Sequence, residues 1–303
     1  MAVSAPFAHA AVLLEPSVAL LEGCRRVLDG TVGAGGHALA LLAGGARVLG
    51  LDRDPAAVRA AGAALGGRAE VLQLDFAAAA GDPAVRTFRP DGVLLDLGVS
   101  SPQLDAAERG FTFRPGAPLD MRMSGVGMTA EGWLNGAAEA ELAEAFRDFG
   151  DERRARALAR QVVRRRATRA FTTSDDLVGA IRATLGPTSG PADFARLFQA
   201  VRIAVNGELE RLERALPALL ELLEPGGVLA VIAYHSGEDR IVKHAFRDWA
   251  RACVCPPGQP VCTCRGAPLG QLLTRRPIEA SAAEVARNPR ARSARLRGFR
   301  KAA

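Results

Sequence analysis

The sequence has 303 residues, of which 49% are hydrophobic, so it can bury a sizeable core and exceeds one average domain. It contains no stretch of roughly 20 uncharged apolar residues, as a membrane span requires, and no secretory signal pattern, so we expect a soluble cytoplasmic protein. The formal net charge of +6 favours a polyanionic partner if the excess charge is concentrated on one surface.

The first hundred residues alternate strand-like and helix-like segments. Runs rich in leucine and β-branched residues cover 26–29, 47–52, 70–76 and 93–97, and alanine-rich stretches follow the first two. This alternation is typical of βαβ units, in which consecutive strands lie parallel in one sheet with helices on its faces. The opening part of the chain is therefore predicted to belong to an α/β fold.

Helical patterns replace the strand signals from residue 108 to 196. They are clearest over 141–166 and 175–185, where Thr173 and Asp176 form a capping box for the second helix. Helical periodicity continues over 192–223, interrupted at Pro217, and short strands are expected at 227–234, 271–275 and 293–299. We predict an α/β core of residues 1–107 and 197–303 with an inserted all-helical domain, residues 108–196, for substrate recognition.

The positive charge is concentrated in two arginine-rich runs. Residues 147–169 contain nine arginines against three acids, and residues 287–303 contain six arginines and one lysine without an acid. A single basic run is as often a solvated helix face as a binding surface, but two such runs favour nucleic acid as the partner.

A glycine-rich segment, Asp29-Gly-Thr-Val-Gly-Ala-Gly-Gly-His37, follows the first predicted strand and precedes a helix. Closely spaced glycines let the backbone turn tightly and approach a ligand, although a plain connecting turn would look similar. The pattern is not Gly-x-Gly-x-x-Gly, which a dinucleotide pyrophosphate would favour. The segment therefore suits a nucleoside ligand without phosphates.

Aspartates stand at the ends of the four predicted strands: Asp29, Asp52, Asp75 and Asp96. Because α/β folds bind ligands at the carboxyl edge of the sheet, we expect these carboxylates to line one site. Asp52 suits the hydroxyls of a ribose, whereas the structural alternative, a helix N-cap, is better suited to Asp54 before a proline. Phe76 would cover an adenine.

Residues 96–105, Asp-Leu-Gly-Val-Ser-Ser-Pro-Gln-Leu-Asp, and 108–111, Glu-Arg-Gly-Phe, resemble the signature of the RsmH (MraW) family. Further matches, in the family's order, lie at 9–15, 118–123, 198–203, 205–206, 235–236, 238–240 and 288–293. The resemblance implies a Rossmann-like class I methyltransferase sheet with an inserted all-helical domain, and S-adenosyl-L-methionine as cofactor. It also implies N4-methylation of a cytosine in the decoding centre of 16S ribosomal RNA, with that RNA or the small ribosomal subunit as partner.

The resemblance also implies a set of cofactor-binding residues: Gly35, Gly36, His37, Asp52, Phe76, Asp96 and Gln103. We add Gly33, which belongs to the same glycine-rich segment. The chain departs from the family pattern at three positions. Ala38 stands where serine is common, Tyr234 where phenylalanine is usual and Gly237 where leucine is usual.

The amino group of cytosine is a poor nucleophile because its lone pair is conjugated with the ring, so catalysis must depend largely on positioning. Many amino methyltransferases have an Asp/Asn-Pro-Pro-aromatic tetrapeptide after the fourth strand, where this chain has Asp96-Leu-Gly-Val99. We expect Asp96 to orient donor or target, and Ser100, Ser101 and His235 to line the base pocket. For His235, a structural hydrogen-bonding role is about equally favoured.

Two other functions compete with this assignment. One is methylation of DNA or protein, which the match along nearly the whole chain disfavours. The other is a non-enzymatic RNA-binding or assembly factor with a vestigial cofactor pocket, which the intact glycines and Asp52 disfavour. The sequence leaves open whether the protein is a monomer or a homodimer.

Four cysteines lie within a dozen residues, at Cys253, Cys255, Cys262 and Cys264. Four thiols can hold a tetrahedral structural zinc, and disulfides are disfavoured in a reducing compartment. The spacing is Cys-x-Cys instead of the commoner Cys-x-x-Cys, so reduced or redox-active thiols remain the alternative.

Overall fold

The structure, a computed structural model, describes residues 11–303 except 257 and 262, and its chain forms two compact units. The first unit contains the residues up to Gly98 together with Glu210–Ala303, and the second contains Val99–Leu209. The boundaries therefore differ from those expected at 107/108 and 196/197. The second unit extends further at its C-terminal end because Leu197, Phe198 and Val201 belong to its hydrophobic core.

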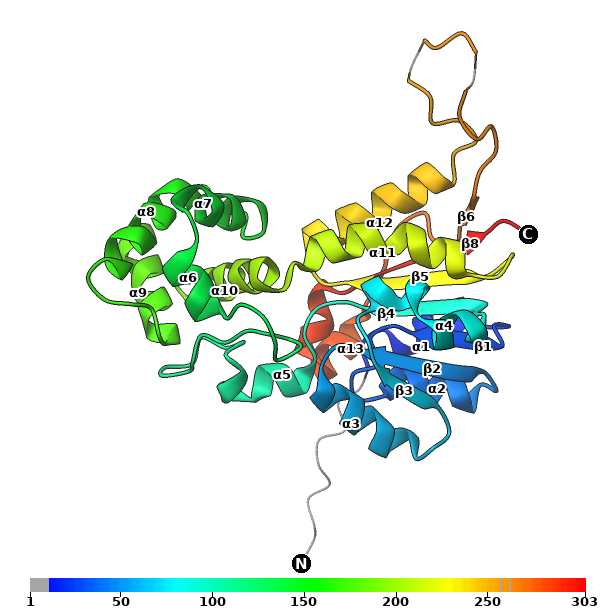
Figure 1. Ribbon diagram of the computed structural model, residues 1–303, viewed down its shortest axis with the longest axis horizontal. Helices are drawn as coiled ribbons and strands as arrows, with labels where there is room; N and C mark the ends of the chain where they lie inside the picture. Colours follow the sequence, from blue (N-terminus) through cyan, green and yellow to red (C-terminus); the bar gives the residue numbers. More distant parts are fainter. Residues whose placement is uncertain (1–10, 257, 262) are drawn as a thin grey trace, which may run out of the picture. The chain divides into compact units, whose positions relative to one another are not determined.

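A single mixed sheet forms the centre of the first unit (Figure 1). Five of its strands are parallel: β1 (Arg26–Asp29), β2 (Arg47–Asp52), β3 (Glu70–Gln73), β4 (Gly92–Asp96) and β5 (Val228–Ala233). Strand β8 (Arg295–Lys301) runs antiparallel between β5 and β6 (Gly270–Leu272), and β7 (Ile278–Glu279) also pairs with β8. The order β3-β2-β1-β4-β5-β8-β6 confirms the predicted Rossmann-like α/β class.

Helices cover both faces of this sheet. One face packs against α1 (Leu14–Leu20), α2 (Gly36–Ala43) and α3 (Pro55–Leu65), and the other against α4 (Pro83–Phe88), α11 (Glu208–Leu222) and α12 (Ser236–Trp249). Successive strand residues point to opposite faces, so Leu94 packs in the first layer and Leu95 in the second. Strand β5 is buried along its whole length, as a continuous apolar run in a central parallel strand predicts.

The third strand is shorter than the predicted 70–76. It ends at Gln73, and a 3-10 turn, η1 (Phe76–Gly81), begins three residues later. The Asp75 carboxylate accepts the Ala77 amide (2.9 Å) and so caps this turn. Asp75 and Phe76 therefore follow the strand instead of closing it.

The second unit is helical, with α5 (Ser101–Asp105), η2 (Ala107–Arg109), α6 (Ala130–Gly136), α7 (Glu139–Asp148), α8 (Ala155–Arg166), α9 (Ser174–Leu185) and α10 (Pro191–Asn206). The predicted capping box of α9 is present, with the Thr173 amide donating to the Asp176 carboxylate (3.0 Å). Phe146 and Phe171 are among the largest side chains of its buried core.

Two predicted helices are broken at places that the sequence pattern did not indicate. The segment 141–166 is divided into α7 and α8 by a turn at Gly150, where a Cβ atom would lie 2.7 Å from the Phe146 carbonyl oxygen. The segment 192–223 breaks at Gly207, whose φ of +57° ends α10, whereas Pro217 lies inside α11. Among the described residues, no helix has the length and apolarity needed to cross a membrane.

The remaining elements precede the last strand. A short helix, α13 (Ala282–Arg287), is followed by the 3-10 turn η3 (Pro289–Ser293). The Glu284 carboxylate accepts the Leu13 amide (2.7 Å), so this segment holds the start of α1 in place.

Candidate active site

The glycine-rich segment crosses the carboxyl edge of the sheet between β1 and α2. The Gly30 amide donates to the Leu94 carbonyl in β4 (2.9 Å), and the Gly33 amide donates to Asp52 Oδ2 at the end of β2 (3.0 Å). The loop is thus fixed over the strand ends where α/β folds bind their ligands.

Two positions of this loop require glycine for different steric reasons. Gly35 precedes α2 with φ +88°, a conformation that residues with a Cβ atom rarely adopt. At Gly30 a Cβ atom would lie 2.6 Å from Leu95 Cδ2 and 3.2 Å from Phe76 Cβ, so this position allows no side chain without rearrangement of the core. The glycines therefore permit both the turn and the close packing of the loop.

Asp52 holds the loop through both of its carboxylate oxygens. Oδ2 accepts the Gly33 amide, and Oδ1 accepts the Asp54 amide (2.9 Å). Burial raises the pKa of Asp52, although these two amides oppose the effect. The N-cap of α3 is Asp54, which accepts the Ala56 amide (2.9 Å) as predicted, so Asp52 is not needed for capping. Each Asp52 oxygen keeps a second lone pair that can accept a hydroxyl group.

Asp96, the last residue of β4, is the centre of a polar cluster. Its Oδ1 accepts the Tyr234 hydroxyl (2.8 Å), and its Oδ2 lies 3.9 Å from His37 Nδ1. His37 Nε2 lies 3.0 Å from the Val12 carbonyl oxygen, which assigns the proton of a neutral ring to Nε2. The Asp96 amide donates to the Thr31 hydroxyl (2.6 Å), so the cluster is tied to the glycine-rich loop.

Buried negative charge distinguishes this edge of the sheet. Burial raises the pKa of Asp29 to about 7 although nearby His37 opposes the shift, and burial also raises the pKa of Asp96. Asp29 Oδ1 accepts the Thr31 amide (3.3 Å), but Oδ2 has no hydrogen-bond partner among the described residues. A cationic ligand group would favour the charged forms of these carboxylates, so the cluster is suited to bind one.

Phe76 and Asp75 have different surroundings. The Asp75 carboxylate caps η1 and also accepts a hydrogen bond from Arg211 of α11 (2.8 Å). It therefore links these two elements. Phe76 is partly buried and packs against the core layer beside Gly30. It therefore lies beside the glycine-rich loop.

His235 is the N-cap of α12. Its Nδ1 accepts the Glu238 amide (3.4 Å), and its Nε2 lies 3.2 Å from Glu238 Oε1. Glu238 is itself buried, and its other oxygen accepts the Tyr234 amide (2.8 Å). His235 therefore caps α12 through Nδ1, while its buried Nε2 has no hydrogen-bond partner among the described residues.

Ser100, Ser101 and Gln103 belong to the second unit. Ser100 caps α5, and Gln103 Oε1 accepts the Ser100 amide (2.9 Å) in a capping box, so both residues have a local structural role. Ser101 begins α5, and its side chain lies outside the described part of the chain. The other candidate residues all belong to the first unit: Gly33, Gly35, Gly36, His37, Asp52, Phe76, Asp96 and His235.

Several motif residues of the second unit hold its own fold together. The Asn206 side chain accepts the Met123 amide (3.0 Å) and donates to the Met121 carbonyl (2.7 Å). Arg109 donates to the Met123 carbonyl (3.0 Å). The segment 118–123 is therefore held by residues of two other motifs.

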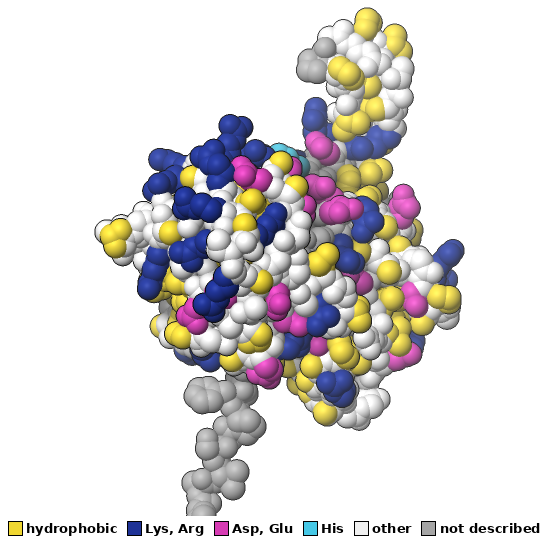
Figure 2. Space-filling view, turned by 60° about the vertical axis from the view of Figure 1, so that its left-hand side comes forward, with side chains coloured by type: hydrophobic (Ala, Val, Ile, Leu, Met, Phe, Trp, Pro, Cys, Tyr) yellow, Lys and Arg dark blue, Asp and Glu magenta, His cyan; other side chains and the backbone are white. Residues whose placement is uncertain are grey.

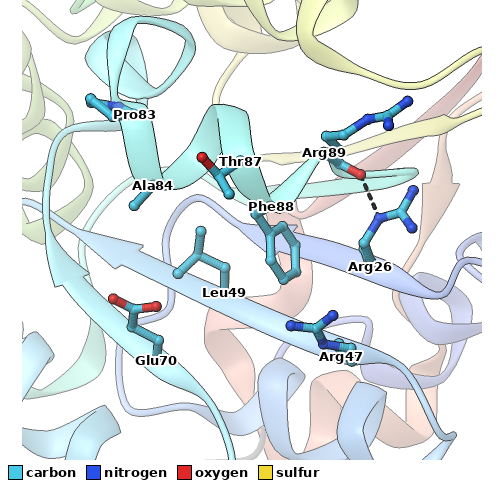
Figure 3. A pocket seen from close by; sticks show the side chains of 9 residues that line it. All are labelled: Arg26, Arg47, Leu49, Glu70, Pro83, Ala84, Thr87, Phe88 and Arg89. Atoms are coloured by element: carbon cyan, nitrogen blue, oxygen red, sulfur yellow. Dashed lines mark hydrogen bonds between the residues drawn. The ribbon is translucent and has the colours of Figure 1, made fainter.

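A hollow of about 550 Å³ lies at the opposite end of the strands (Figure 3). It is lined by Arg26 and Arg47 at the starts of β1 and β2, by Glu70 at the start of β3 and by residues of α4, including Phe88. The Arg47 guanidinium lies 5.9 Å from the centre of the Phe88 ring. Because it opens at the amino ends of the strands, this hollow is separate from the Asp29 and Asp96 cluster.

The sequence matches the MraW methylase family over residues 6–302. The chain belongs to this family. The protein named ribosomal RNA small subunit methyltransferase H of Gemmatimonas aurantiaca is 56% identical over 300 residues, which cover 97% of this chain and 95% of that protein. The protein of the same name from Heliobacterium modesticaldum is 48% identical over 312 residues, covering 97% and 99%. The family resemblance drawn from the motifs is thus confirmed along nearly the whole chain.

The two arginine-rich runs of this MraW family member differ in structure. Arginines gather on the helical unit (Figure 2), where Arg153, Arg154 and Arg156 at the start of α8 are exposed. In the second run, Arg297 is 7% exposed in β8 and makes two hydrogen bonds to Asp239 (2.6 and 3.1 Å). Part of the C-terminal positive charge is therefore neutralised in a buried ion pair and cannot contact a polyanion.

Three of the four clustered cysteines are described: Cys253, Cys255 and Cys264, whose Sγ atoms all lie within 4.8 Å of one another. Cys262 lies outside the described residues. The cluster belongs to the loop between α12 and β6.

The sequence did not predict the residues that hold the polar side chains of the site in place. Thr31, Tyr234 and Glu238 hold Asp96 and His235, but none of them was predicted as a site residue. The acid at Glu238, in the first turn of the helix that follows a buried strand, was the available signal, because a buried carboxylate must find donors.

Proposed function

We propose that this chain transfers a methyl group from S-adenosyl-L-methionine to N4 of a cytosine in the decoding centre of 16S ribosomal RNA. The observation that carries the proposal is the full-length similarity to proteins named ribosomal RNA small subunit methyltransferase H, combined with an acidic site at the carboxyl edge of the sheet. Its partner is 16S ribosomal RNA or the small ribosomal subunit, which places its action in the cytoplasm.

The first unit has the features that this cofactor requires. S-adenosyl-L-methionine has a sulfonium and an ammonium cation, and the incompletely bonded, buried Asp29 carboxylate and the Asp96 cluster favour positive charge. In this proposal Asp52 accepts the ribose hydroxyls, Phe76 covers the adenine and the glycine-rich loop supports the ligand. When bound, the cofactor supplies an electrophilic methyl group.

Asp96 is assigned the role of positioning residue at the reacting end of the site. Its Oδ1 is held by Tyr234, while Oδ2, 3.9 Å from His37 Nδ1, leaves space for a closer donor. An acceptor that hydrogen-bonds the protons of the cytosine amine would favour development of the nitrogen lone pair. Fixing the amine in line with the methyl group would supply much of the rate enhancement.

The exposed arginines of α8 would bind the RNA backbone. A cytosine in folded RNA must be unstacked or presented in a loop before its amino group can enter a pocket, and phosphate contacts around it hold that conformation. Arginine suits this task because its planar guanidinium binds phosphate through two hydrogen bonds.

The proposal is tested by incubating the protein with labelled S-adenosyl-L-methionine and small subunits assembled without this enzyme. The product RNA is then digested and the modified nucleotide mapped. N4-methylcytidine at one decoding-centre position is the expected result. Methylation of a different base, or RNA binding without methyl transfer, would contradict the assigned reaction.

Asp96→Asn provides a matched test of the site. The amide keeps the shape and can accept the Tyr234 hydroxyl, but it loses the negative charge and one acceptor oxygen. We expect turnover to fall by about 100-fold, as for loss of a transition-state contact of about 2.7 kcal/mol. Wild-type turnover and cofactor affinity in this variant would exclude the role given to Asp96.

A further inference from the structure

We propose that the thiols of Cys253, Cys255 and Cys264 form a zinc site that folds the loop between α12 and β6. Their Sγ atoms already lie within 4.8 Å of one another. In a tetrahedral site with Zn–S distances of about 2.3 Å, the sulfurs are separated by about 3.8 Å. A small inward movement of flexible side chains is enough to bind the metal.

The backbone around the thiols supports this arrangement. The Val254 amide donates to Cys264 Sγ (3.4 Å), an N–H···S contact that stabilises a thiolate ligand. The adjacent Arg265 ties the loop to the end of α12, donating to the carbonyls of Asp248 and Arg251. The loop therefore brings thiols from its first and second halves together, and Arg265 anchors it to the end of α12.

The described residues of the loop form no hydrophobic core of their own. Val254 and Val261 are 40% and 71% exposed, and no described residue from 251 to 269 belongs to a buried core cluster. A segment with so little apolar burial needs a cross-link to hold one conformation. Three convergent thiols favour a metal, because a disulfide would use two and leave the third unpaired.

Zinc fits the chemistry of these ligands. Thiolates are soft donors that select zinc over magnesium or calcium, and a site with several thiolates is typical of structural zinc. The three described thiols supply three of the four ligands of a tetrahedral site. The site lies in a different part of the first unit from the glycine-rich loop, so it does not depend on the reaction proposed above.

The test uses the full-length protein, purified without chelator, with its metal content measured by mass spectrometry. We expect about one zinc per chain, released when the thiols are modified. Cys255→Ser should lose most of this zinc, whereas the control Cys24→Ser, a thiol near the amino end of β1, should keep it. Equal midpoints of both variants in urea unfolding would show that they are folded.

Cobalt(II) provides a second readout that does not depend on activity. When added to the zinc-free protein, it should produce the intense visible bands of a tetrahedral site and a near-ultraviolet thiolate band, and both should be weak in Cys255→Ser. Chains without zinc whose thiols are all titratable would overturn the proposal. Loss of two titratable thiols without zinc would show a disulfide and would also overturn it.

Discussion

At the scale of single residues, the site depends on carboxylates that the fold has placed away from water. Asp29 and Asp96 are both neighbours of His37, and Tyr234 supplies a hydrogen bond that partly offsets the burial of Asp96. Such groups cost stability when they are charged in the absence of a ligand, and this cost can be recovered when a cation binds. Their protonation is therefore expected to affect both stability and activity.

Tyr234→Phe should shift the pH dependence of methyl transfer. The lost hydroxyl had lowered the pKa of Asp96, so the pKa rises further and the acidic limb of the pH profile moves to higher pH. The unfolding free energy should drop by about 1 kcal/mol. Because the substitution removes only the hydroxyl and leaves the ring and the Asp96 carboxylate in place, turnover above that limb should stay within about twofold of wild type. An unshifted profile would show that the hydroxyl does not act on Asp96.

Asp29→Asn should alter how stability depends on pH. The folded pKa of about 7 lies above the unfolded value, so the unfolded state loses its proton first and wild-type stability falls as pH rises from about 4 to 7. Asparagine cannot ionise, yet it keeps an acceptor for the Thr31 amide. The stability difference, variant minus wild type, should increase across this range, by at most about 1.4 kcal/mol per pH unit. Urea unfolding at several pH values measures it, and parallel curves would refute it.

At the scale of helices and strands, local pattern predicted most of the first unit. The runs at 26–29 and 47–52 coincide with β1 and β2, and the predicted βαβ alternation corresponds to the parallel part of the sheet. The glycine-rich loop and three of the aspartates were located by the same signals, because strand ends and turns leave local marks in a sequence.

Features that depend on tertiary contacts were not predictable in this way. The buried ion pair between Arg297 and Asp239 looks in sequence like part of a basic tail, since nothing local reveals its partner. The same holds for the structural role of His235, which depends on the burial of Glu238. Local propensity reports neither the burial nor the partner of a polar side chain.

Two glycines allow a test of backbone crowding in the second unit. Gly110 and Gly116 both have positive φ, +73° and +76°, but only at Gly110 would a Cβ atom meet backbone, 2.4 Å from the Pro118 oxygen. Gly110→Ala should lower the unfolding free energy by about 3 kcal/mol, and Gly116→Ala by about 1 kcal/mol. Chemical denaturation compares them, and equal losses would mean that strain alone accounts for both.

At the scale of the whole molecule, the helical unit is inserted between β4 and β5, which are neighbours in the sheet. One chain therefore joins an acidic site in the first unit to a strongly basic surface in the second. This division predicts that RNA binding and cofactor binding can be changed separately.

Replacing Arg153, Arg154 and Arg156 with glutamate should weaken RNA binding and flatten its dependence on salt, because fewer counterions are released. Cofactor affinity should not change. Glutamate at the start of α8 suits the helix dipole, so the fold should tolerate the substitutions. Reversing the exposed Arg59 and Arg86 of the first unit is the control, with a smaller expected effect on RNA affinity. Unchanged RNA affinity in the α8 variant would rule out this surface.

The place of β8 has a consequence for how the protein is made. This strand covers β5, a run of six buried apolar residues, yet β5 leaves the ribosomal exit tunnel long before residue 301 has been synthesised. During that interval the nascent chain has an unpaired apolar strand edge, the type of surface that recruits other unfolded chains. The chain is therefore expected to depend most on chaperones in the interval between the emergence of β5 and the emergence of β8.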